Sequence, residues 1–297
     1  MNLVIAKASF LELTYNNVTG LGARYALFAG IAYLLGYVLF KRQWFPRKII
    51  AKFPQSSEVR REMAYSAVCL LIFAMVGAAT IYAARHGWTQ MYFKLSRYPA
   101  WWFWTSIGIA IIIHDTWFYW THRLMHHPRL FRAFHRVHHL SHNPTPWAAY
   151  AFSPLEAVTQ AAIFPIAVTV MPMHPYAFGL FMMWQIVYNI LGHSGYEIHP
   201  RWLMKSPLRF IVNTPTNHVM HHETLRGNYG LYFNVWDRLM RTNHRDYEDR
   251  FIQVTSRPSA RKTDELVTAT PEVRSALPPE SPVLPPDLAL GSHTRSP

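Results

Sequence analysis

The sequence predicts an all-α integral-membrane protein, a helical bundle with a helical, histidine-rich cap on one side of the membrane. Three observations lead to this fold class. Of the 297 residues, 51% are hydrophobic and only 15% are charged, whereas a soluble globular protein averages about 25% charged residues. Long apolar stretches alternate with shorter polar segments, and clusters of histidines follow the later apolar stretches.

Four apolar stretches are long enough to cross a bilayer, which takes about 20 residues of helix. They cover residues 21–40, 63–84, 99–121 and 157–191. Pro172 and Pro175 bracket a turn inside the fourth stretch, so this stretch is expected to form a tight hairpin of two shorter helices. The expected bundle therefore has about four or five membrane passes.

Membrane topology accounts for the net charge of +13. Many basic residues gather in the loop 41–62, between the first two apolar stretches, and loops rich in Lys and Arg stay in the cytoplasm. The third stretch and the hairpin then end on the same side, so the whole histidine-rich cap is expected at the cytoplasmic face. No basic groove interleaved with aromatic residues indicates a nucleic-acid partner.

We expect residues 1–252 to form the membrane-embedded unit, with its histidine motifs between residues 114 and 222. Residues 253–297 are rich in Pro and Ser and lack apolar periodicity, which predicts a disordered tail. The N-terminal residues have neither a basic start nor a sustained apolar core, so a cleavable signal peptide is not expected.

The histidine clusters have the spacing of ligands on a helix. One cluster has two histidines at i and i+4, and the strings "HRVHH" (135–139) and "HVMHH" (218–222) place histidines at i, i+3 and i+4, positions on one helix face. Neutral imidazole is the commonest metal ligand and suits zinc, copper, iron and nickel. One ion uses about four to six ligands, so the set, with His193, indicates two metals. Its members are His122, His126, His135, His138, His139, His193, His218, His221 and His222.

The other histidines are interpreted differently, because an isolated histidine is more often solvated or interfacial than ligating. Three of them, His127, His142 and His199, neighbour the clusters but break their spacing, and whether they also ligate stays open. The remaining isolated ones, at positions 86, 174, 244 and 293, are not expected to bind metal.

Asp115 is the acidic residue expected to support the metal site. It lies seven residues before His122, two helical turns along the same face, near the membrane end of an apolar helix where carboxylates are costly and usually functional. We expect it to accept a hydrogen bond from a ligand imidazole and to fix its tautomer. Pairing with Arg123 is the alternative.

Four ordered blocks resemble the fatty acid hydroxylase and sterol desaturase superfamily of integral-membrane di-iron enzymes. The blocks are "DTWFYWTHRLMHH", "FHRVHHLSHNPTPWAAYAFSPLEA", "LGHSGYEIHP" and "TPTNHVMHHETLRGNYGLYFNVWDRLMRT". The resemblance implies an oxygen-dependent enzyme with two iron ions, bound at the cytoplasmic membrane face by the histidines of the three clusters and by His193. Zinc can replace iron in such an all-nitrogen site.

Within this superfamily, "PTPWAAYAF" and "NYG…WDRL" are most similar to the sterol C5-desaturase branch, which usually has a histidine at the position of Ser153. The resemblance implies a membrane lipid as substrate and leaves open its identity, the carbon attacked, and the choice between hydroxylation and desaturation. A histidine-rich metal transporter or metal-storage protein is the alternative function.

The electrons for such a reaction are expected from a separate donor. No dinucleotide-binding glycine motif, cysteine set for an iron–sulfur cluster or His-Pro-Gly-Gly haem loop is found in the sequence. A reductase, ferredoxin or cytochrome is therefore expected as partner, and the basic loop 41–62 is one place where an acidic donor could dock.

Overall fold

The computed structural model describes residues 8–258, and within them the regular structure is helical, with isolated β-bridges and no strands. The described residues up to Arg257 form one compact unit. Its last helix, α12 (Tyr247–Ser256), continues four residues beyond the predicted boundary at Ile252. The predicted tail lies, from residue 259 onward, outside the described residues.

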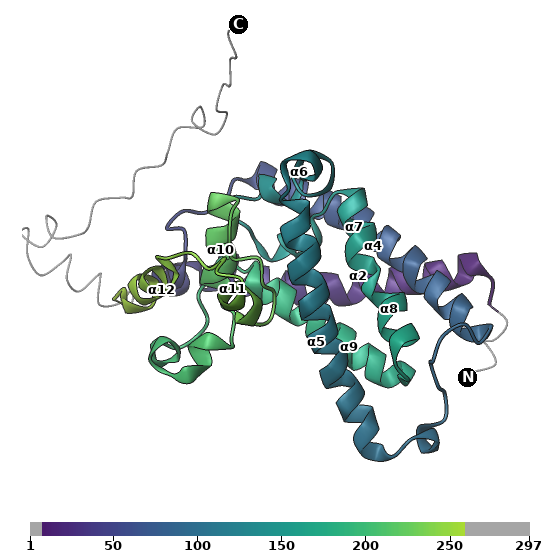
Figure 1. The fold of residues 1–297 in the computed structure, drawn as a ribbon. Coiled ribbons are helices and arrows are strands. Elements are labelled where there is room, and N and C mark those ends of the chain that lie inside the picture. Colours follow the sequence, from purple (N-terminus) through teal and green to yellow (C-terminus); the bar gives the residue numbers. More distant parts are fainter. Residues whose placement is uncertain (1–7, 259–297) are drawn as a thin grey trace, which may run out of the picture. The chain divides into compact units, whose positions relative to one another are not determined.

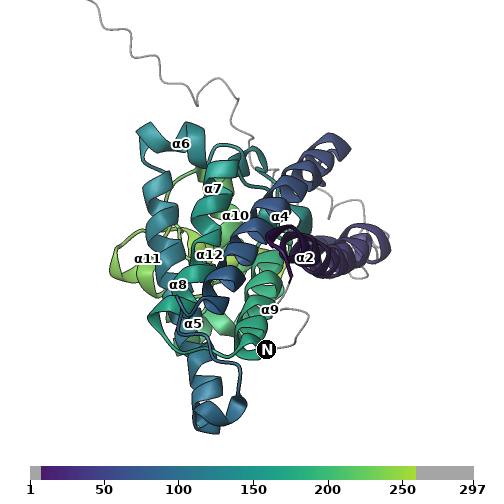
Figure 2. The same ribbon diagram turned by 90° about the vertical axis from the view of Figure 1, so that its right-hand side faces the viewer.

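The first layer consists of two long helices that lie side by side (Figure 2). Helix α2 (Phe10–Tyr33) runs into a π-helical turn, η1 (Leu34–Leu39), and α4 covers Ser56–Arg85. Capping boxes, Ser9 with Glu12 and Gln55 with Glu58, satisfy the free N–H groups where these helices begin. Both helices are long and apolar enough to cross a membrane.

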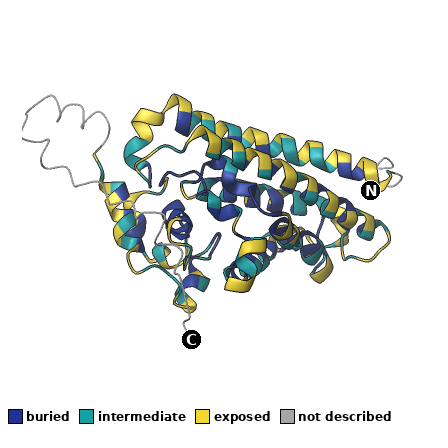
Figure 3. Cartoon of the chain, turned by 90° about the horizontal axis from the view of Figure 1, so that it is seen from above, coloured by how far each residue is buried: buried dark blue, intermediate teal, exposed yellow. Residues whose placement is uncertain are grey.

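These two candidate spans keep much of their apolar surface exposed. Only 11% of the most apolar window of α2–η1 is buried, and 33% of that of α4. Exposed residues, coloured yellow, recur along the helix nearest the N-terminus in Figure 3. A core helix of a soluble protein would bury this surface, so these faces suit contact with lipid.

The remaining apolar segments form α5 (Ala100–Met125), α7 (Pro154–Ala161), α8 (Ile163–Val170) and α9 (Pro175–Gly192). The chain breaks between α8 and α9 at the prolines that predicted a hairpin. By length and composition none of these helices is a candidate span, because polar residues such as His114, Asp115 and Gln185 interrupt α5 and α9. These residues point inward and are buried. The count of four or five passes stays a prediction.

Short helices at one end of this bundle form the histidine-rich part (Figure 1). They include α6 (Pro128–Phe134), α10 (Pro215–Thr224) and α11 (Val235–Leu239), and α12 packs on α10. One-turn helices connect the rest: α3 (Lys41–Trp44), η2 (Phe45–Arg47), η3 (Leu95–Arg97), η4 (His138–Leu140), η5 (Pro146–Tyr150), η6 (Arg201–Lys205) and η7 (Pro207–Phe210).

A buried lysine ties the basic loop to two histidine-bearing segments. Lys48 is fully buried, its Nζ donates to Asn143 Oδ1 at 2.8 Å, and it lies 5.4 Å from the ring centroids of Tyr37 and Tyr196. Gly195, with φ of +75°, leaves the space that this ammonium occupies, because a Cβ there would stand 2.7 Å from Lys48 Nζ.

Lys48 is expected to make stability depend on pH. Burial lowers the pKa of Lys48 to about 7, whereas the unfolded chain holds this proton up to an ordinary pKa of about 10.4. Between these values the unfolded state binds more protons, so stability rises as pH rises from about 7 to 10. The gain should be on the order of a few kcal/mol.

Thermal unfolding of the detergent-solubilised protein across this pH range measures the effect, with Lys48→Met as the comparison. The variant should lose most of the upward slope. An equal slope in both proteins would assign the pH dependence to other groups.

Candidate metal centre

The structure brings all nine predicted histidines together in two adjacent groups. In each group the candidate ligand nitrogens lie within 4.8 Å of one another. The five-histidine group comprises His122, His126, His135, His139 and His221, and the four-histidine group comprises His138, His193, His218 and His222. The ring centroids of His139 and His222, one from each group, are 4.9 Å apart.

The two groups divide the histidine clusters between them. Residues at i and i+4 stay together: His122 with His126, His135 with His139, and His218 with His222. The i+3 residues, His138 and His221, belong to the opposite group. Because i+3 and i+4 are neighbours in sequence, they diverge by about 100° around a helix. The two clusters of three histidines therefore each contribute ligands to both groups, whereas His122 and His126 both belong to the five-histidine group.

The cluster 135–139 also departs from the predicted helix. Helix α6 ends at Phe134, residues 135–137 form a turn, and η4 begins at His138. The backbone still turns by roughly one helical repeat, since His139 N–H donates to His135 O at 3.3 Å. His135 and His139 therefore still lie in the same group, although no α-helix connects them.

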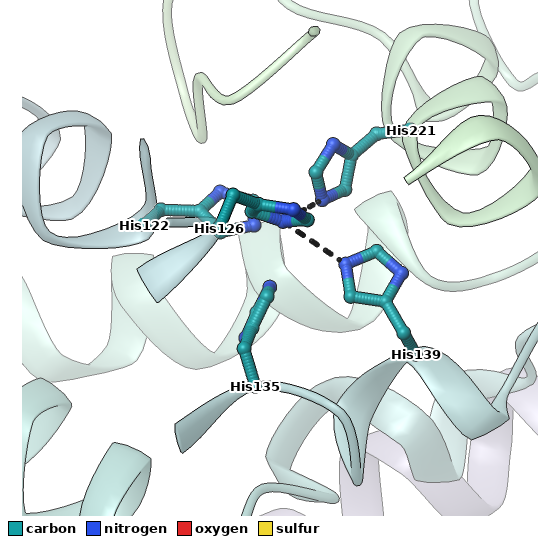
Figure 4. A group of neighbouring side chains, drawn as sticks. All are labelled: His122, His126, His135, His139 and His221. Carbon is teal, nitrogen blue, oxygen red and sulfur yellow. Dashed lines mark hydrogen bonds between the residues drawn. The ribbon is translucent and has the colours of Figure 1, made fainter. Parts of the chain in front are cut away.

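Each imidazole turns its Nε2 atom toward the middle of its group. In the five-histidine group, His126 Nε2 lies 3.1 Å from His221 Nε2 and 3.2 Å from His139 Nε2 (Figure 4). In the four-histidine group, His193 Nε2 lies 2.9 Å from His218 Nε2 and 3.2 Å from His138 Nε2.

For three of the imidazoles, a backbone carbonyl group outside the histidine group determines which ring nitrogen has the proton. The Nδ1 atoms of His122, His193 and His221 face the carbonyl oxygens of Tyr229, Asn189 and Gly227 at 2.9, 2.8 and 2.6 Å. A carbonyl only accepts, so each Nδ1 is the donor and each Nε2 has a bare lone pair.

This arrangement fits a metal better than it fits an empty interior. Bare Nε2 lone pairs that point at each other repel, and His122 Nε2 and His135 Nε2 are buried without a hydrogen-bond partner among the described residues. Buried polar atoms are rarely left in this state. A cation at the centre of each group would turn the repulsion into coordination, with outer hydrogen bonds of the kind that orient metal-bound histidines.

Burial also keeps the nine imidazoles in the form that binds metal. It lowers the pKa of each of them, and repulsion between neighbouring imidazolium charges adds to the effect for most. The rings are therefore neutral near pH 7, as ligation requires.

Local structure fixes the start of α10, which bears three of the nine histidines. Thr214 caps the helix and Pro215 occupies its first turn. Glu197, buried, accepts from Thr216 N at 3.0 Å and from Thr216 Oγ1 at 2.6 Å. A carboxylate at a helix N-terminus also interacts favourably with the helix dipole.

The three histidines whose role was open lie outside both groups. His127 caps α6 by accepting from Arg129 N, and His199 Nδ1 pairs with Glu197 Oε1 at 2.9 Å. His142 Nδ1 faces the backbone oxygen of His222. Ser153, where the C5-desaturase branch usually has histidine, caps α7 by accepting from Glu156 N.

The structure contradicts the predicted contact of Asp115. Its Oδ1 accepts from the backbone N–H groups of Tyr232 and Phe233 at 2.8 and 3.1 Å, and no imidazole hydrogen-bonds to it among the described residues. Asp237 binds Tyr229 N and Gly230 N in the same loop. The two carboxylates thus hold the loop whose carbonyl groups orient His122 and His221, so Asp115 acts on the site through the backbone.

Sequence reasoning missed Glu156, the carboxylate that contacts one of the nine grouped imidazoles. Its Oε1 lies 2.8 Å from His135 Nδ1, and both side chains are 1% exposed. A signal was present, because Glu156 is the one acidic residue between Asp115 and Glu197. It also missed His114, whose Nδ1 lies 2.7 Å from the Tyr232 hydroxyl, within the bundle.

Comparison with known proteins adds the family. Residues 107–242, which include both histidine groups, match the model of the fatty acid hydroxylase family. This segment is therefore similar to the fatty acid hydroxylase family. The nine imidazoles all lie within residues 107–242 and come from α5, the segment 135–139, the end of α9 and α10.

Similarity to individual proteins extends beyond residues 107–242 and covers most of the chain. A Delta(7)-sterol 5(6)-desaturase of Gibberella zeae is 28% identical over 74% of this chain and 66% of its own length. The Leptosphaeria maculans protein of that name is 28% identical over 72% of this chain and 56% of its own length. A lathosterol oxidase of Mus musculus is 28% identical over 75% of this chain and 72% of its own.

The chain spans about two thirds or less of the length of the first two of these relatives. No solved structure gives a significant match.

Proposed function

We propose that the protein is a membrane-bound, oxygen-dependent oxidoreductase that hydroxylates or desaturates a C–H bond of a lipid. The observation that supports this most directly is the pair of adjacent, buried imidazole groups with inward-facing Nε2 atoms. The family match supports the reaction class, and relatives named sterol desaturase and lathosterol oxidase support a lipid substrate.

In this proposal the five-histidine group holds one iron ion and the four-histidine group the other. When bound, the two ions supply the oxygen activation that an unreactive C–H bond requires and that side chains cannot provide. Carbonyl groups of Asn189, Gly227 and Tyr229 keep three ligand imidazoles oriented. The aromatic side chains around both groups exclude water from them.

We further propose that the metal centre lies at the cytoplasmic membrane face and that α5 and the α8–α9 hairpin enter the bilayer beside α2 and α4. The exposed apolar faces of α2 and α4 support the membrane location. The cluster of Lys and Arg in the connection between these two helices supports the orientation.

Iron analysis combined with oxygen uptake tests the function. The iron-loaded protein in lipid vesicles should contain about two iron ions per chain, as two groups of four and five ligands imply. It should consume oxygen only with a reductant and a lipid, and mass spectrometry should show a lipid that has gained one oxygen atom or lost two hydrogen atoms. Metal flux across the vesicle membrane without lipid turnover would instead support a transporter.

We propose that the electron donor docks on α6. This helix lies between His126 and His135 in the sequence, and the Phe131 ring is 5.5 Å from the His126 ring. His126 is also the one member of the nine that is not fully buried. Around it, Arg129, Arg132, Arg136 and Arg226 are exposed and make no ion pair with any described residue.

The basic loop 41–62 is less suited to docking than expected from its composition. Lys48 is buried, Arg47 donates to His199 O and Arg61 donates to Leu140 O. These three cations contribute to the fold, while Lys41, Arg42, Lys52 and Arg60 stay exposed. The arginines of α6 are favoured as the docking site because they lie beside His126 and are free to attract an acidic partner.

Reversing charge on α6 should therefore slow electron delivery. We expect Arg129→Glu combined with Arg132→Glu to lower the rate of reduction by an acidic ferredoxin or cytochrome about 10-fold or more at low salt. Stopped-flow spectroscopy measures this rate, and the difference should shrink as salt rises. Reduction by dithionite should stay unchanged. Arg201→Glu with Lys205→Glu, also exposed, is the control, and equal slowing by that pair would argue against a site on α6.

A further inference from the structure

A small pocket connects the surface with the four-histidine group. Its inner wall includes His193 and His218, both buried. Its outer rim includes Ile198, which is 49% exposed, and the partly exposed ring of His199. The volume is about 40 Å³, which holds a few water molecules. The pocket therefore suits water or another molecule of a few atoms, and not a lipid.

An unpaired nitrogen in the pocket wall favours water as the occupant. Nδ1 of His218 is buried without a hydrogen-bond partner among the described residues. When Nε2 of this ring binds a metal, Nδ1 has the proton and needs an acceptor. No Asp or Glu lines the pocket, so no carboxylate of the wall accepts this bond. A water molecule would accept it, as buried waters do for polar groups that are otherwise unpaired.

His199, at the rim, is held in one tautomer. Its Nδ1 and its backbone N each lie 2.9 Å from Glu197 Oε1. Because a carboxylate only accepts, Nδ1 is the donor and Nε2 keeps a lone pair. Glu197 is itself fixed, since its Oε2 accepts two hydrogen bonds from Thr216. An imidazole oriented in this way can accept a proton at Nε2 and release it again near neutral pH.

The rim lies beside the basic loop 41–62, which the proposed topology places in the cytoplasm. Arg47 of this loop donates through Nη1 to His199 O at 3.0 Å, and Glu197 N donates to Arg47 O at 2.9 Å. The His199 side chain is 23% exposed. Its ring therefore has solvent on one side and the pocket on the other.

We propose that His199, oriented by Glu197, transfers protons from solvent into this pocket for the reduction of oxygen at the four-histidine group. This inference rests on the function proposed above. Hydroxylation combines a lipid C–H bond, O2, two electrons and two protons into an alcohol and one water. Desaturation takes the same inputs and gives an alkene and two waters. The electron donor supplies the electrons, so either reaction needs two protons from solvent.

Each proton moves in two steps. It passes from His199 Nε2 to water in the pocket, and Nε2 then takes up another proton from solvent. Apart from His199, the wall has no titratable side chain other than Tyr188 and the two ligand histidines. Transfer through one water molecule is within the reach expected of a general acid.

His199→Ala tests the transfer, and His142→Ala is the matched control. His142 is also exposed and near the four-histidine group, since its Nδ1 faces His222 O, but it does not line the pocket. We expect His199→Ala to lower kcat for lipid oxidation about 10-fold to 100-fold. KM for the lipid and the iron content should not change, and imidazole added to the buffer should restore the rate. His142→Ala should resemble the wild type.

An unchanged kcat in His199→Ala, or a fall that imidazole does not reverse, would overturn the proposal. A similar fall in His142→Ala would do the same. His199→Gln keeps a donor for Glu197 but cannot pass on a proton, so it takes the place of His199→Ala if that variant does not fold.

The metal-free protein tests whether solvent reaches Nε2 of His199. Diethylpyrocarbonate acylates unprotonated imidazole nitrogens, and mass spectrometry of peptides locates the modified histidines. We expect His199 to be modified, with exposed His142 as the internal reference. A protected His199 beside a modified His142 would show that solvent does not reach this nitrogen, and the proposal would fall.

A lipid-free measurement separates this proposal from the proposed function. When the reduced, iron-loaded protein meets oxygen, two electrons and two protons convert O2 into H2O2, and phenol red in weak buffer follows the proton uptake. Uptake should be about 10-fold slower in His199→Ala than in the wild type. If both proteins oxidise lipid and take up protons equally fast, the function stands and the role of His199 falls. If neither oxidises lipid but uptake is slower in the variant, the role of His199 stands and the lipid-oxidising function falls.

Discussion

His218→Gln is expected to lose one of the two metal ions and to reduce lipid oxidation to background. His218 Nε2 lies 2.9 Å from His193 Nε2 and 3.2 Å from His222 Nε2, so its loss leaves three imidazoles in the four-histidine group. Metal analysis should show a fall from about two iron ions to about one per chain, the number of intact groups. Because the proposed reaction uses both ions, activity should disappear with the first.

His221→Gln makes the same test on the five-histidine group, three residues further along α10. Four imidazoles remain there, so a smaller loss of metal is expected than in His218→Gln. His199→Gln is the control, since His199 belongs to neither group and contacts Glu197. Full iron content in His218→Gln would contradict ligation by the four-histidine group, and iron loss in His199→Gln would indicate general unfolding.

Glu156→Ala should weaken metal binding or lower activity about 10-fold to 100-fold, the usual effect of removing the outer hydrogen-bond partner of a metal-bound histidine. Neither histidine group contains a carboxylate, so two dications would have no anion among their ligands. Glu156 is buried against His135, and its Oε2 has no partner among the described residues. A cation bound by His135 would favour the ionised form of this buried carboxyl group, whose charge would then offset part of the charge of the metals.

Glu156→Gln separates orientation from charge, because the amide oxygen still accepts from His135 Nδ1. Competition with a chelator measures iron affinity, and we expect Glu156→Gln to lie between the wild type and Glu156→Ala. Glu248→Gln, at a half-exposed ion pair with Arg238, is the control. Equal affinity in the wild type and in Glu156→Ala would show that this carboxylate has no part in metal binding.

Much of the fold could be predicted, because helices and membrane segments depend on local composition. The two long helices α2 and α4, the break before Pro175 and the polar connection between α2 and α4 all follow from apolar runs, prolines and charges near in sequence. The number of passes was harder to predict. The polar residues of α5 and α9 lower the hydropathy of those helices, and only packing shows that they face inward.

The wrong prediction for Asp115 and the missed contact of Glu156 have the same cause. Asp115 was placed against His122 by helical spacing, which says which residues share a face but not which neighbouring segment that face meets. The loop that contains Tyr232 and Phe233 is 117 or more residues away in the chain, and its two N–H groups donate to Asp115 Oδ1, where the prediction placed an imidazole. Glu156 meets His135 across a separation of 21 residues, a contact that no periodicity describes.

Sequence alone determined which nine side chains could ligate and which pairs among them stay together, because i, i+4 spacing is a local property of the backbone. Tertiary structure alone decided how these pairs are shared between two centres. His138 and His139 belong to different groups, and so do His221 and His222. These two groups exist only where α5, the segment 135–139, α9 and α10 come together in the folded chain. That meeting is set by long-range packing of buried side chains, which a linear pattern of residues does not encode.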